Sequence, residues 1–327
     1  MRVYHGGDLS DATARFGDPA DGWVDLSTGI NACPWHISSD FAGSLHRLPG
    51  EDQLDRLRLA AASAYGIEDM SRIVLAAGTQ TLIQWIPRLR LKGRVLVISP
   101  TYGEHAPAWR AAGHEVHESS GLIHHKNYDV VVVTCPNNPD GRLFPRSVLE
   151  SVAEGLARRT GLLVIDEAFA DVSAEPSLVA SISEGVVALR SFGKFFGIPG
   201  LRLGFGITDR TTAQSLKNAL GPWPISTLAA EMGVAALGDL QWQSEMRDYL
   251  SIASGRMDDL LTRAGLQVVG GTNLFRLAAT PDAMNVFEQL GRSGIYTRHF
   301  PENPAWLRFG LPGSERHWQR LEMALNL

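Results

Sequence analysis

The sequence predicts an α/β protein with a mostly parallel central sheet, followed by a smaller α+β domain. Short apolar segments alternate with segments of helical periodicity between residues 52 and 207. Several apolar segments are continuous, as in strands that are buried on both faces of a sheet. Polar residues follow the ends of these segments, which is where open α/β sheets bind their ligands.

Periodicity and chain-breaking residues place the individual elements. Residues 1–50 are expected to be irregular, with a short strand and turn near 25–31. The expected strands of the large domain are 73–76, 94–98, 128–134, 162–165, 186–189 and 201–207. Its expected helices are 52–65, 79–91, 104–112, 147–159 and 213–237, the last interrupted at 221–224.

A long helix at 240–264 is expected to lead into the second domain. That domain has predicted strands near 266–278, 294–298 and 306–310, and helices near 281–292 and 314–326. The predicted domains are therefore an N-terminal arm that joins the small domain (1–46), a large domain (47–239) and a C-terminal small domain (240–327).

Composition limits the partners. The chain of 327 residues has a net charge of −5 and no sustained basic stretch, so neither nucleic acid nor a membrane is expected as a partner. Cys33 and Cys135 are the only cysteines, which favours a reducing compartment over a disulfide framework. No apolar segment reaches membrane-spanning length and the N-terminus lacks a signal core. A cytoplasmic protein with a small-molecule substrate is expected.

The stretch from Ser191 to Arg202 carries the predicted reactive group. Three glycines and a proline predict an exposed loop rather than a regular helix. Lys194 has phenylalanines on both sides, and apolar surroundings favour the neutral amine that forms Schiff bases. Ser191 and Arg202 are donor types that hold a phosphate. A carbonyl cofactor with a phosphate group fits these residues, and pyridoxal phosphate is such a cofactor.

Two other interpretations of this stretch stay open at this point. Ser191-x-x-Lys194 is also the nucleophile motif of serine acyl-transfer enzymes, but those place it at a helix start and need a Lys-Thr-Gly that this chain lacks. The stretch would otherwise be a plain strand connection with a solvated lysine.

Further polar residues follow the other predicted strands. Gly78-Thr79 opens a helix whose backbone amides suit a phosphate, although, taken by itself, an ordinary N-cap at Thr79 is the better explanation. Tyr102 offers a ring for stacking and Asn138 an amide. Asp166 follows four apolar residues, and a carboxylate in such a place needs a cationic partner. A pyridinium nitrogen supplies one.

Four histidines are spaced closely enough to suggest a metal site: His114, His117, His124 and His125. The first pair alternates on an expected edge strand, and the second pair lies in a polar loop. Solvated histidines and no metal site are therefore expected.

Together the motifs resemble the fold-type-I pyridoxal-phosphate enzymes of the aspartate aminotransferase superfamily, over nearly the whole chain. Within it, the chain resembles the L-threonine-O-3-phosphate decarboxylases of cobalamin biosynthesis. The superfamily resemblance rests on Gly78-Thr79, Tyr102, Pro136-Asn-Asn-Pro139, Asp166-Glu-Ala168 and Ser191-x-x-Lys194-x₇-Arg202. The decarboxylase resemblance rests on His5-Gly6-Gly7-Asp8, Asp25-Leu-Ser-Thr-Gly-Ile-Asn31, Asp166-Glu-Ala-Phe169, Leu189-Arg-Ser191 and Pro222-Trp-Pro-Ile-Ser226.

The resemblance implies a role for each matched residue. Lys194 would form the Schiff base and move protons, Asp166 would pair with the ring nitrogen, and Asn138 would pair with the ring 3-oxygen while Tyr102 stacks on the ring. Those four form the implied catalytic set. The implied phosphate-binding residues are Gly78, Thr79, Ser191 and Arg202. The implied substrate-binding residues are His5, Gly6, Gly29, Asn138, Arg298 and Arg308, with Arg308 on the substrate carboxylate and Arg298 as a second anion-binding arginine.

The chain departs from the superfamily pattern at two places. Related aminotransferases usually have tyrosine where this chain has Phe169, so one hydrogen bond to the cofactor is expected to be absent. Members also carry a Tyr-Pro whose hydroxyl reaches the cofactor phosphate of the other subunit, and here the sequence is Arg47-Leu48-Pro49. The cross-subunit phosphate contact is therefore in question, although a homodimer is expected.

The resemblance implies a decarboxylase that converts O-phospho-L-threonine to an aminopropanol phosphate and CO₂. A histidinol-phosphate aminotransferase is the alternative, because the same residues serve both reactions and the orientation of the substrate selects between them. A cofactor-less interaction protein is a third hypothesis, against which Lys194, Asp166 and Arg202 all argue.

Overall fold

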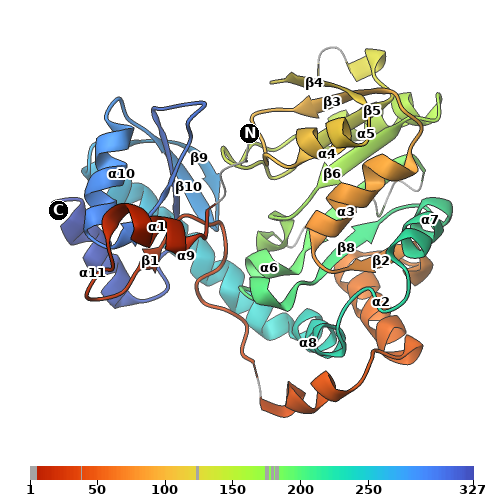
Figure 1. The fold of residues 1–327 in the computed structure, drawn as a ribbon, viewed down its shortest axis with the longest axis horizontal. Coiled ribbons are helices and arrows are strands. Elements are labelled where there is room, and N and C mark those ends of the chain that lie inside the picture. The colour runs from red at the N-terminus through yellow and green to blue at the C-terminus, as the bar shows by residue number, and fades with distance from the viewer. Residues whose placement is uncertain (1–5, 38, 123–124, 174–176, 178–179, 181–183) are drawn as a thin grey trace. The chain divides into compact units, whose positions relative to one another are not determined.

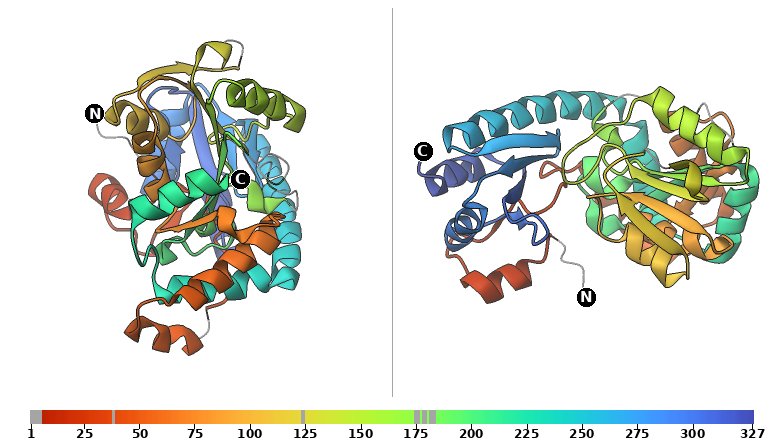
Figure 2. Two further views of the ribbon diagram at one scale, coloured as in Figure 1. Left: turned by 90° about the vertical axis from the view of Figure 1, so that its right-hand side faces the viewer. Right: turned by 90° about the horizontal axis from the view of Figure 1, so that it is seen from above.

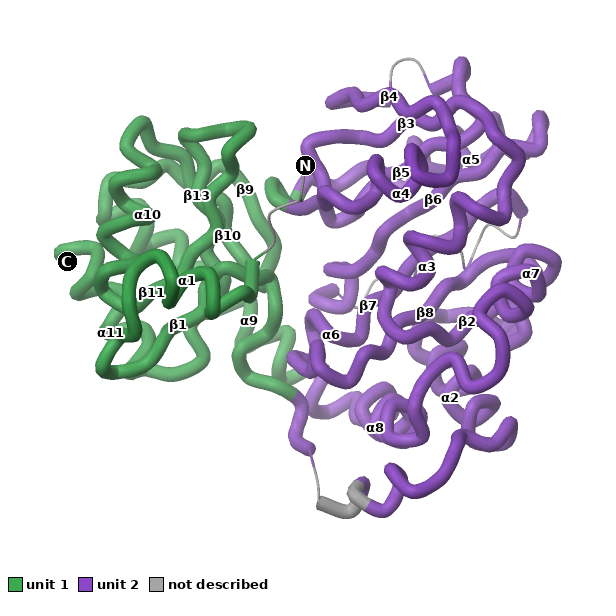
Figure 3. Tube along the Cα trace, in the orientation of Figure 1, with its two compact units in different colours: residues 1–34, 139–141, 244–327 green, residues 35–138, 142–243 purple. Residues whose placement is uncertain are grey.

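The computed structural model describes residues 6–37, 39–122, 125–173, 177, 180 and 184–327. Contacts within the chain divide it into two compact units (Figure 3). The larger unit comprises residues 35–138 and 142–243, and the smaller comprises 1–34, 139–141 and 244–327. Residues 35–46, which the sequence analysis placed in the N-terminal arm, thus belong to the larger unit.

A seven-stranded sheet forms the centre of the larger unit (Figure 1), in the order β2-β8-β7-β6-β5-β3-β4. All neighbouring pairs are parallel except β2–β8 and β7–β8, which are antiparallel. The strands are β2 (Ile73–Ala76), β3 (Arg94–Ile98), β4 (Glu115–Ser119), β5 (Val130–Thr134), β6 (Leu162–Asp166), β7 (Val186–Ser191) and β8 (Gly204–Ile207). The predicted α/β class with a mostly parallel sheet is confirmed.

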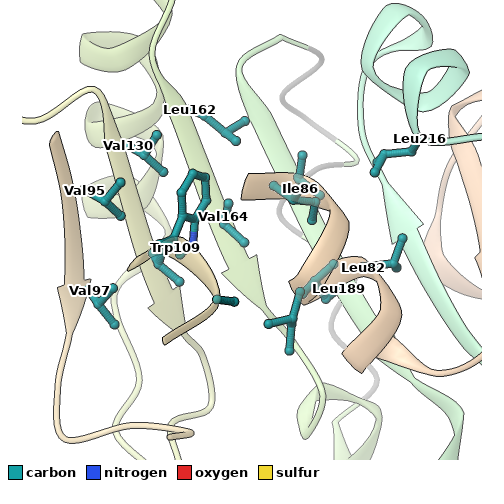
Figure 4. Close-up of a cluster of buried hydrophobic side chains, with 14 of the residues drawn as sticks. Leu82, Ile86, Val95, Val97, Trp109, Val130, Leu162, Val164, Leu189 and Leu216 are labelled. Carbon is teal, nitrogen blue, oxygen red and sulfur yellow. The ribbon is translucent and has the colours of Figure 1, made fainter. Parts of the chain in front are cut away.

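Helices cover this sheet because their apolar faces match its buried strands. The helices of the larger unit are α2 (Glu51–Tyr65), α3 (Thr79–Trp85), α4 (His105–Ala111), α5 (Arg146–Ala157), α6 (Phe192–Phe195), α7 (Arg210–Leu220) and α8 (Thr227–Gly238). On one face, Leu82 of α3, Trp109 of α4 and Leu216 of α7 pack with Val95 and Val164 of the strands (Figure 4). Burying these side chains away from water is the main stabilising term for the unit.

The smaller unit is built on a four-stranded antiparallel sheet in the order β12-β13-β10-β9 (Figures 1 and 2). Its strands are β9 (Gln267–Thr272), β10 (Phe275–Ala279), β12 (Arg298–His299) and β13 (Trp306–Gly310), and β1 (Val24–Asp25) pairs with β11 (Ile295–Tyr296) beside it. Its helices are α1 (Leu9–Phe16), α10 (Ala283–Arg292) and α11 (Glu315–Ala324), and α9 (Leu240–Arg263) leads into it from the larger unit. The predicted α+β character is confirmed.

Two local predictions about backbone structure were wrong. The expected irregular N-terminus contains α1, whose N-cap Asp8 accepts hydrogen bonds from the backbone amides of Ser10 and Asp11. The expected exposed loop around Lys194 contains the single-turn helix α6, and its phenylalanines are buried. Within residues 191–202, only Pro199, Gly200 and Arg202 are exposed. The glycines limit the length of the helix there but do not prevent one turn.

His114 is buried rather than solvated, because its ring packs on Trp109 of α4 and lies against the 3-10 helix Ile86–Leu89. Its Nε2 donates to the Pro87 carbonyl at 2.9 Å, and its Nδ1 accepts from the Gly93 amide at 3.2 Å. His117 lies on the edge strand β4 as expected, and His124 lies outside the described residues. Among the described residues, no group of three or more His, Cys, Asp or Glu side chains is placed to hold a metal ion. Nor does any helix in that part of the chain combine the length and apolar composition needed to cross a bilayer.

Candidate active site

Lys194 lies in α6, directly after the carboxyl end of β7. Its Nζ atom is 5.5 Å from the ring centroid of Phe169, which follows β6. The two phenylalanines near it in sequence, Phe192 and Phe195, are buried in the core, and Phe195 packs on Trp242. The apolar contact of the amine therefore comes from Phe169, whereas the neighbouring phenylalanines anchor the helix that carries the amine.

Three chain segments form a narrow backbone cradle at the start of α3. Gly78 is the N-cap of this helix, with a φ of 82° that only glycine adopts at low cost, so the cap lies one residue before the predicted Thr79. A Cβ atom on Gly78 would lie 2.5 Å from Nη2 of Arg202, and one on Gly204 would lie 2.5 Å from the Thr79 nitrogen. Ser191 is the β7 partner of Gly204 in the sheet. The structure thus brings Gly78, Thr79, Ser191 and Arg202 together.

Asp166 ends β6 and is almost completely buried. Its Oδ2 atom lies 2.9 Å from Nε2 of His105, and its Oδ1 atom accepts the backbone amide of Ala168 at 3.0 Å. A carboxylate only accepts hydrogen bonds, so Nε2 of His105 carries a hydrogen. This pair fixes the carboxylate of Asp166 in one orientation.

His105 was not predicted as a site residue. The expected partner of Asp166 was a cofactor nitrogen alone, whereas His105, the first residue of α4, contacts the carboxylate. Tyr102 precedes α4 and His105 is its first residue, so helical spacing gave no signal for their contact. Their rings make an edge-to-face contact with centroids 5.9 Å apart.

Tyr102 and Asn138 follow β3 and β5, and both are held by neighbours that the sequence analysis did not single out. The Tyr102 hydroxyl donates to Oε1 of Gln80 at 3.2 Å. Asn137, which is buried, accepts from the Thr101 hydroxyl at 2.8 Å and donates to the Pro100 carbonyl at 2.9 Å. These bonds fix Asn137, directly before the turn that begins at Asn138.

A buried ionic cluster lies next to Asp166 and Ser191 in the sequence. It contains Glu167, which follows Asp166, and Arg190, which precedes Ser191. Arg190 contacts Glu167 at 2.9 Å and Asp171 at 2.8 Å, and its guanidinium lies 4.9 Å from the ring centroid of Tyr65. Burial raises the pKa of Tyr65 well above its ordinary value, with a further contribution from Asp171. Since breaking one partner of a buried ion pair is costly, the cluster resists movement of these segments.

In the smaller unit, Arg298 and Arg308 are cross-strand partners on β12 and β13. Side chains of directly opposed residues share one face of a sheet, so two positive charges lie side by side. Burial, together with the charge of Arg298, lowers the pKa of Arg308 to about 9, and the charge of Asp25 opposes this shift. An anion held between the two guanidinium groups would relieve this repulsion.

The N-terminal segment meets Arg308 at Ser27. Nη2 of Arg308 donates to the Ser27 carbonyl at 2.6 Å, and a Cβ atom on Gly6 would lie only 2.2 Å from the same oxygen. Gly29 is buried two residues further on. His5 lies outside the described residues.

The residues of the larger unit suit pyridoxal phosphate. The cradle of Gly78 and Gly204 leaves backbone amides accessible where side chains would block them, and the amine, the buried carboxylate and the ring of Tyr102 lie at the same ends of neighbouring strands. Arg298, Arg308 and Ser27 belong to the smaller unit.

Comparisons with known proteins agree with this interpretation. The family Aminotransferase class I and II matches residues 38–322. The threonine-phosphate decarboxylase of Pseudomonas aeruginosa is 43% identical over 325 residues, covering 98% of this chain and 96% of that protein. The histidinol-phosphate aminotransferase of Nitratidesulfovibrio vulgaris strain DP4 is 30% identical over 264 residues, covering 74% and 70%.

A solved structure gives the same fold. The histidinol-phosphate aminotransferase of Sinorhizobium meliloti in complex with pyridoxal-5'-phosphate superposes with a TM-score of 0.82 and 20% identity, covering 99% of this chain and 94% of that chain. The predicted fold-type-I architecture is confirmed, and so is pyridoxal phosphate as the cofactor. The chain belongs to the aminotransferase class I and II family.

Proposed function

We propose that the protein is a pyridoxal-phosphate-dependent decarboxylase of O-phospho-L-threonine, which releases CO₂ and leaves an aminopropanol phosphate for cobalamin biosynthesis. The paired arginines on β12 and β13 carry this proposal, because two neighbouring guanidinium groups suit the phosphate of the substrate and leave its carboxylate free. The 43% identity to a threonine-phosphate decarboxylase over nearly the full length supports it.

Pyridoxal phosphate, when bound, supplies an electron sink for the bond that breaks at the substrate Cα atom. Lys194 would bind the cofactor through its amine and move a proton at Cα. Asp166, oriented by His105, would keep the ring nitrogen protonated. The cradle of Gly78, Thr79, Ser191 and Arg202 would hold the phosphate, while Tyr102 and Asn138 would fix the ring.

The arginines would choose between the two reactions of this site. If they hold the substrate phosphate, the carboxylate is free to take the position from which it leaves as CO₂. If Arg308 instead holds the carboxylate, the Cα proton leaves and transamination follows. We propose the first arrangement. Arg298→Ala and Arg308→Ala show how much each arginine contributes to phosphate binding.

Purified protein incubated with O-phospho-L-threonine should release CO₂ without any keto acid, and free threonine should be a much poorer substrate. Arg298→Ala and Arg308→Ala should each lower kcat/KM for the phosphorylated substrate. The loss of transition-state stabilisation should be about 2–5 kcal/mol if the charged hydrogen bond is desolvated. The variant that loses the phosphate contact should also lose the preference for O-phospho-L-threonine over free threonine.

Reduction with borohydride should attach the cofactor covalently to Lys194. A reduced adduct on Lys126 or Lys217 would contradict the proposed site.

A histidinol-phosphate aminotransferase is the second candidate, supported by the 30% identity to such an enzyme. The same assay separates the two functions. Turnover that requires a keto acid, with histidinol phosphate as the better amine donor, would favour the aminotransferase and reject the decarboxylase.

We also propose that the enzyme is a cytoplasmic homodimer. Exposed apolar side chains follow one another from the 3-10 helix Ser39–His46 into α2: Leu45, Leu48 and Leu59 are 66%, 64% and 61% exposed. Trp223, 56% exposed, lines a groove with Leu54 and Arg58 of α2. Apolar surface of this kind is typical of protein interfaces, and a second copy would cover it.

A further inference from the structure

We propose that Ser27 is a positioning residue that couples the N-terminal Gly6-Gly7 segment to the anion-binding side chain of Arg308. Binding of the substrate anion to Arg308 and ordering of the Gly6-Gly7 segment on Ser27 would then favour each other. This inference rests on the proposed function, in which Arg308 binds an anionic group of the substrate.

Ser27 is completely buried, and each of its polar groups is used. Its hydroxyl donates to Oδ1 of Asp25 at 2.6 Å and accepts from the Gly7 amide at 2.7 Å. Its own amide donates to the same Asp25 oxygen at 2.8 Å, and its carbonyl accepts from Arg308 at 2.6 Å. Ser27 thus joins two parts of the chain: its hydroxyl binds Gly7 of the N-terminal segment, and its carbonyl binds Arg308.

Close packing makes this connection stiff. A Cβ atom on Gly6 would lie 2.2 Å from the Ser27 carbonyl oxygen, the atom that Arg308 contacts. Two residues beyond Arg308, the Gly310 amide donates to the Leu26 carbonyl at 2.7 Å, and a Cβ atom on Gly310 would lie 2.5 Å from the Thr28 carbonyl. Segment 26–28 is therefore clamped between the N-terminal residues and the end of β13, so a shift of one contact moves the other.

Asp25 sets the charge on this connection. It holds Ser27 through two hydrogen bonds, and its negative charge favours the charged form of Arg308. When an anion binds Arg308, the pull on the Ser27 carbonyl changes, and the hydroxyl–Gly7 contact responds. Such coupling is reciprocal, so ordering the N-terminal segment must favour anion binding by the same factor.

The test measures anion binding and N-terminal order together, in holoenzyme whose cofactor has been reduced with borohydride. Inorganic phosphate is the probe, because the cofactor phosphate already occupies its own cradle in this form. Binding is followed by calorimetry, and hydrogen exchange of a peptide covering residues 6–16 reports the Gly7 amide. The variants are Ser27→Ala, Gly6→Ala and Arg308→Ala, with Ser254→Ala as matched control.

Ser254 is a buried serine of the same unit whose hydroxyl bonds to Ser251 and Asn273 and not to the Arg308 site. We expect Ser27→Ala to raise the Kd for phosphate about 3- to 30-fold, from the usual net contribution of lost hydrogen bonds. Gly6→Ala should raise the Kd as well, because its Cβ atom displaces the Ser27 carbonyl that Arg308 contacts. Ser254→Ala should bind like the parent protein. Phosphate should slow exchange of the 6–16 peptide in the parent and in Ser254→Ala, but not in Ser27→Ala.

The outcomes separate this inference from the proposed function. If Arg308→Ala binds phosphate like the parent protein, Arg308 is not an anion site and the proposed function loses its support. If Arg308→Ala loses binding while both Ser27→Ala and Gly6→Ala bind normally, the coupling through Ser27 is rejected. If Ser27→Ala fails to fold, Gly6→Ala alone decides, because it presses on the Ser27 carbonyl without removing any hydrogen bond of Ser27.

Discussion

At the scale of single residues, the environment of each reactive group follows from what packs against it. Phe169 lies below the amine of Lys194, at the position where related aminotransferases carry a tyrosine. A phenylalanine ring gives the amine an apolar neighbour but no hydrogen-bond donor. The ring 3-oxygen of the cofactor would therefore have one donor fewer than in a tyrosine-containing site.

Phe169→Tyr should lower the spectroscopic pKa of the cofactor bound to Lys194. A phenolic donor stabilises the ionised 3-oxygen, which then holds the proton of the Lys194 nitrogen less tightly; a bond to a charged group corresponds to about one to two pH units. An absorbance titration against pH measures this directly. An unchanged or raised pKa would mean that residue 169 does not face the cofactor.

If Arg308 binds an anionic group of the substrate as proposed, we expect substrate binding to depend on pH in the alkaline range. Its pKa is lowered to about 9 by burial and by Arg298, so the guanidinium is charged below that pH and neutral above it. Only the charged form attracts an anion. Once phosphate is fully the dianion, its affinity for the reduced holoenzyme should therefore fall as the pH rises through the pKa of Arg308.

Asp25→Asn tests the sign of this effect, because the charge of Asp25 opposes the lowering of the pKa of Arg308. Removing that charge should move the alkaline loss of phosphate binding to lower pH. A shift to higher pH, or a profile identical to that of the parent protein, would show that Arg308 does not control the binding.

At the scale of elements, the phosphate cradle depends on how closely three backbones approach. The sheet pairs Ser191 of β7 with Gly204 of β8, and Gly204 in turn lies against the first residue of α3. Because a helix N-terminus presents unpaired amides, this approach leaves them available to a phosphate. A side chain at position 204 would fill the space between strand and helix.

Gly204→Ala should weaken cofactor binding, since its Cβ atom would lie 2.5 Å from the Thr79 nitrogen and something must move. We expect the Kd for pyridoxal phosphate, measured by titrating the apoenzyme, to rise by about tenfold or more, equal to the loss of one charge-assisted hydrogen bond. Gly155→Ala, in α5 and with nothing within 4 Å of its Cβ atom, is the control and should bind normally. Equal affinities of the two variants would contradict the assignment of the cradle.

At the scale of the whole molecule, each unit has its own sheet, and the residues assigned to cofactor and substrate divide between them. The cofactor residues lie at the strand ends of the larger unit, whereas the paired arginines lie on β12 and β13 of the smaller one. The exposed leucines before and within α2 add a third feature, an apolar surface on the larger unit.

Leu48→Glu should weaken the homodimer, because a charge buried in an apolar interface is costly. Sedimentation at several protein concentrations should show the parent protein at twice the chain mass and the variant shifted toward the single chain. Leu91→Glu is the matched control, since Leu91 is 96% exposed and lies outside the proposed surface. A monomeric parent protein, or identical behaviour of the two variants, would reject the proposed interface.

Local sequence was enough to predict most of the fold and the identity of the main reactive residues. β2 and β3 have the predicted bounds. Asp166 and Ser191 are the last residues of their strands, which run one and two residues beyond the predicted ends, and Lys194 follows a strand as expected. The physical reason is that strand burial, helix periodicity and turn residues act over a few positions, so a short stretch carries them. Motifs such as Asp166-Glu-Ala168 sit at these boundaries and therefore could be read from the sequence.

Tertiary packing decided the partners of those residues. His105 beside Asp166, Phe169 beside Lys194, and Ser27 beside Arg308 are joined across 61, 25 and 281 positions of the chain. The burial of His114 likewise depends on the carbonyl of Pro87 and the amide of Gly93. Periodicity identifies which face of an element is buried, but which side chain meets it depends on how the whole chain closes around its core.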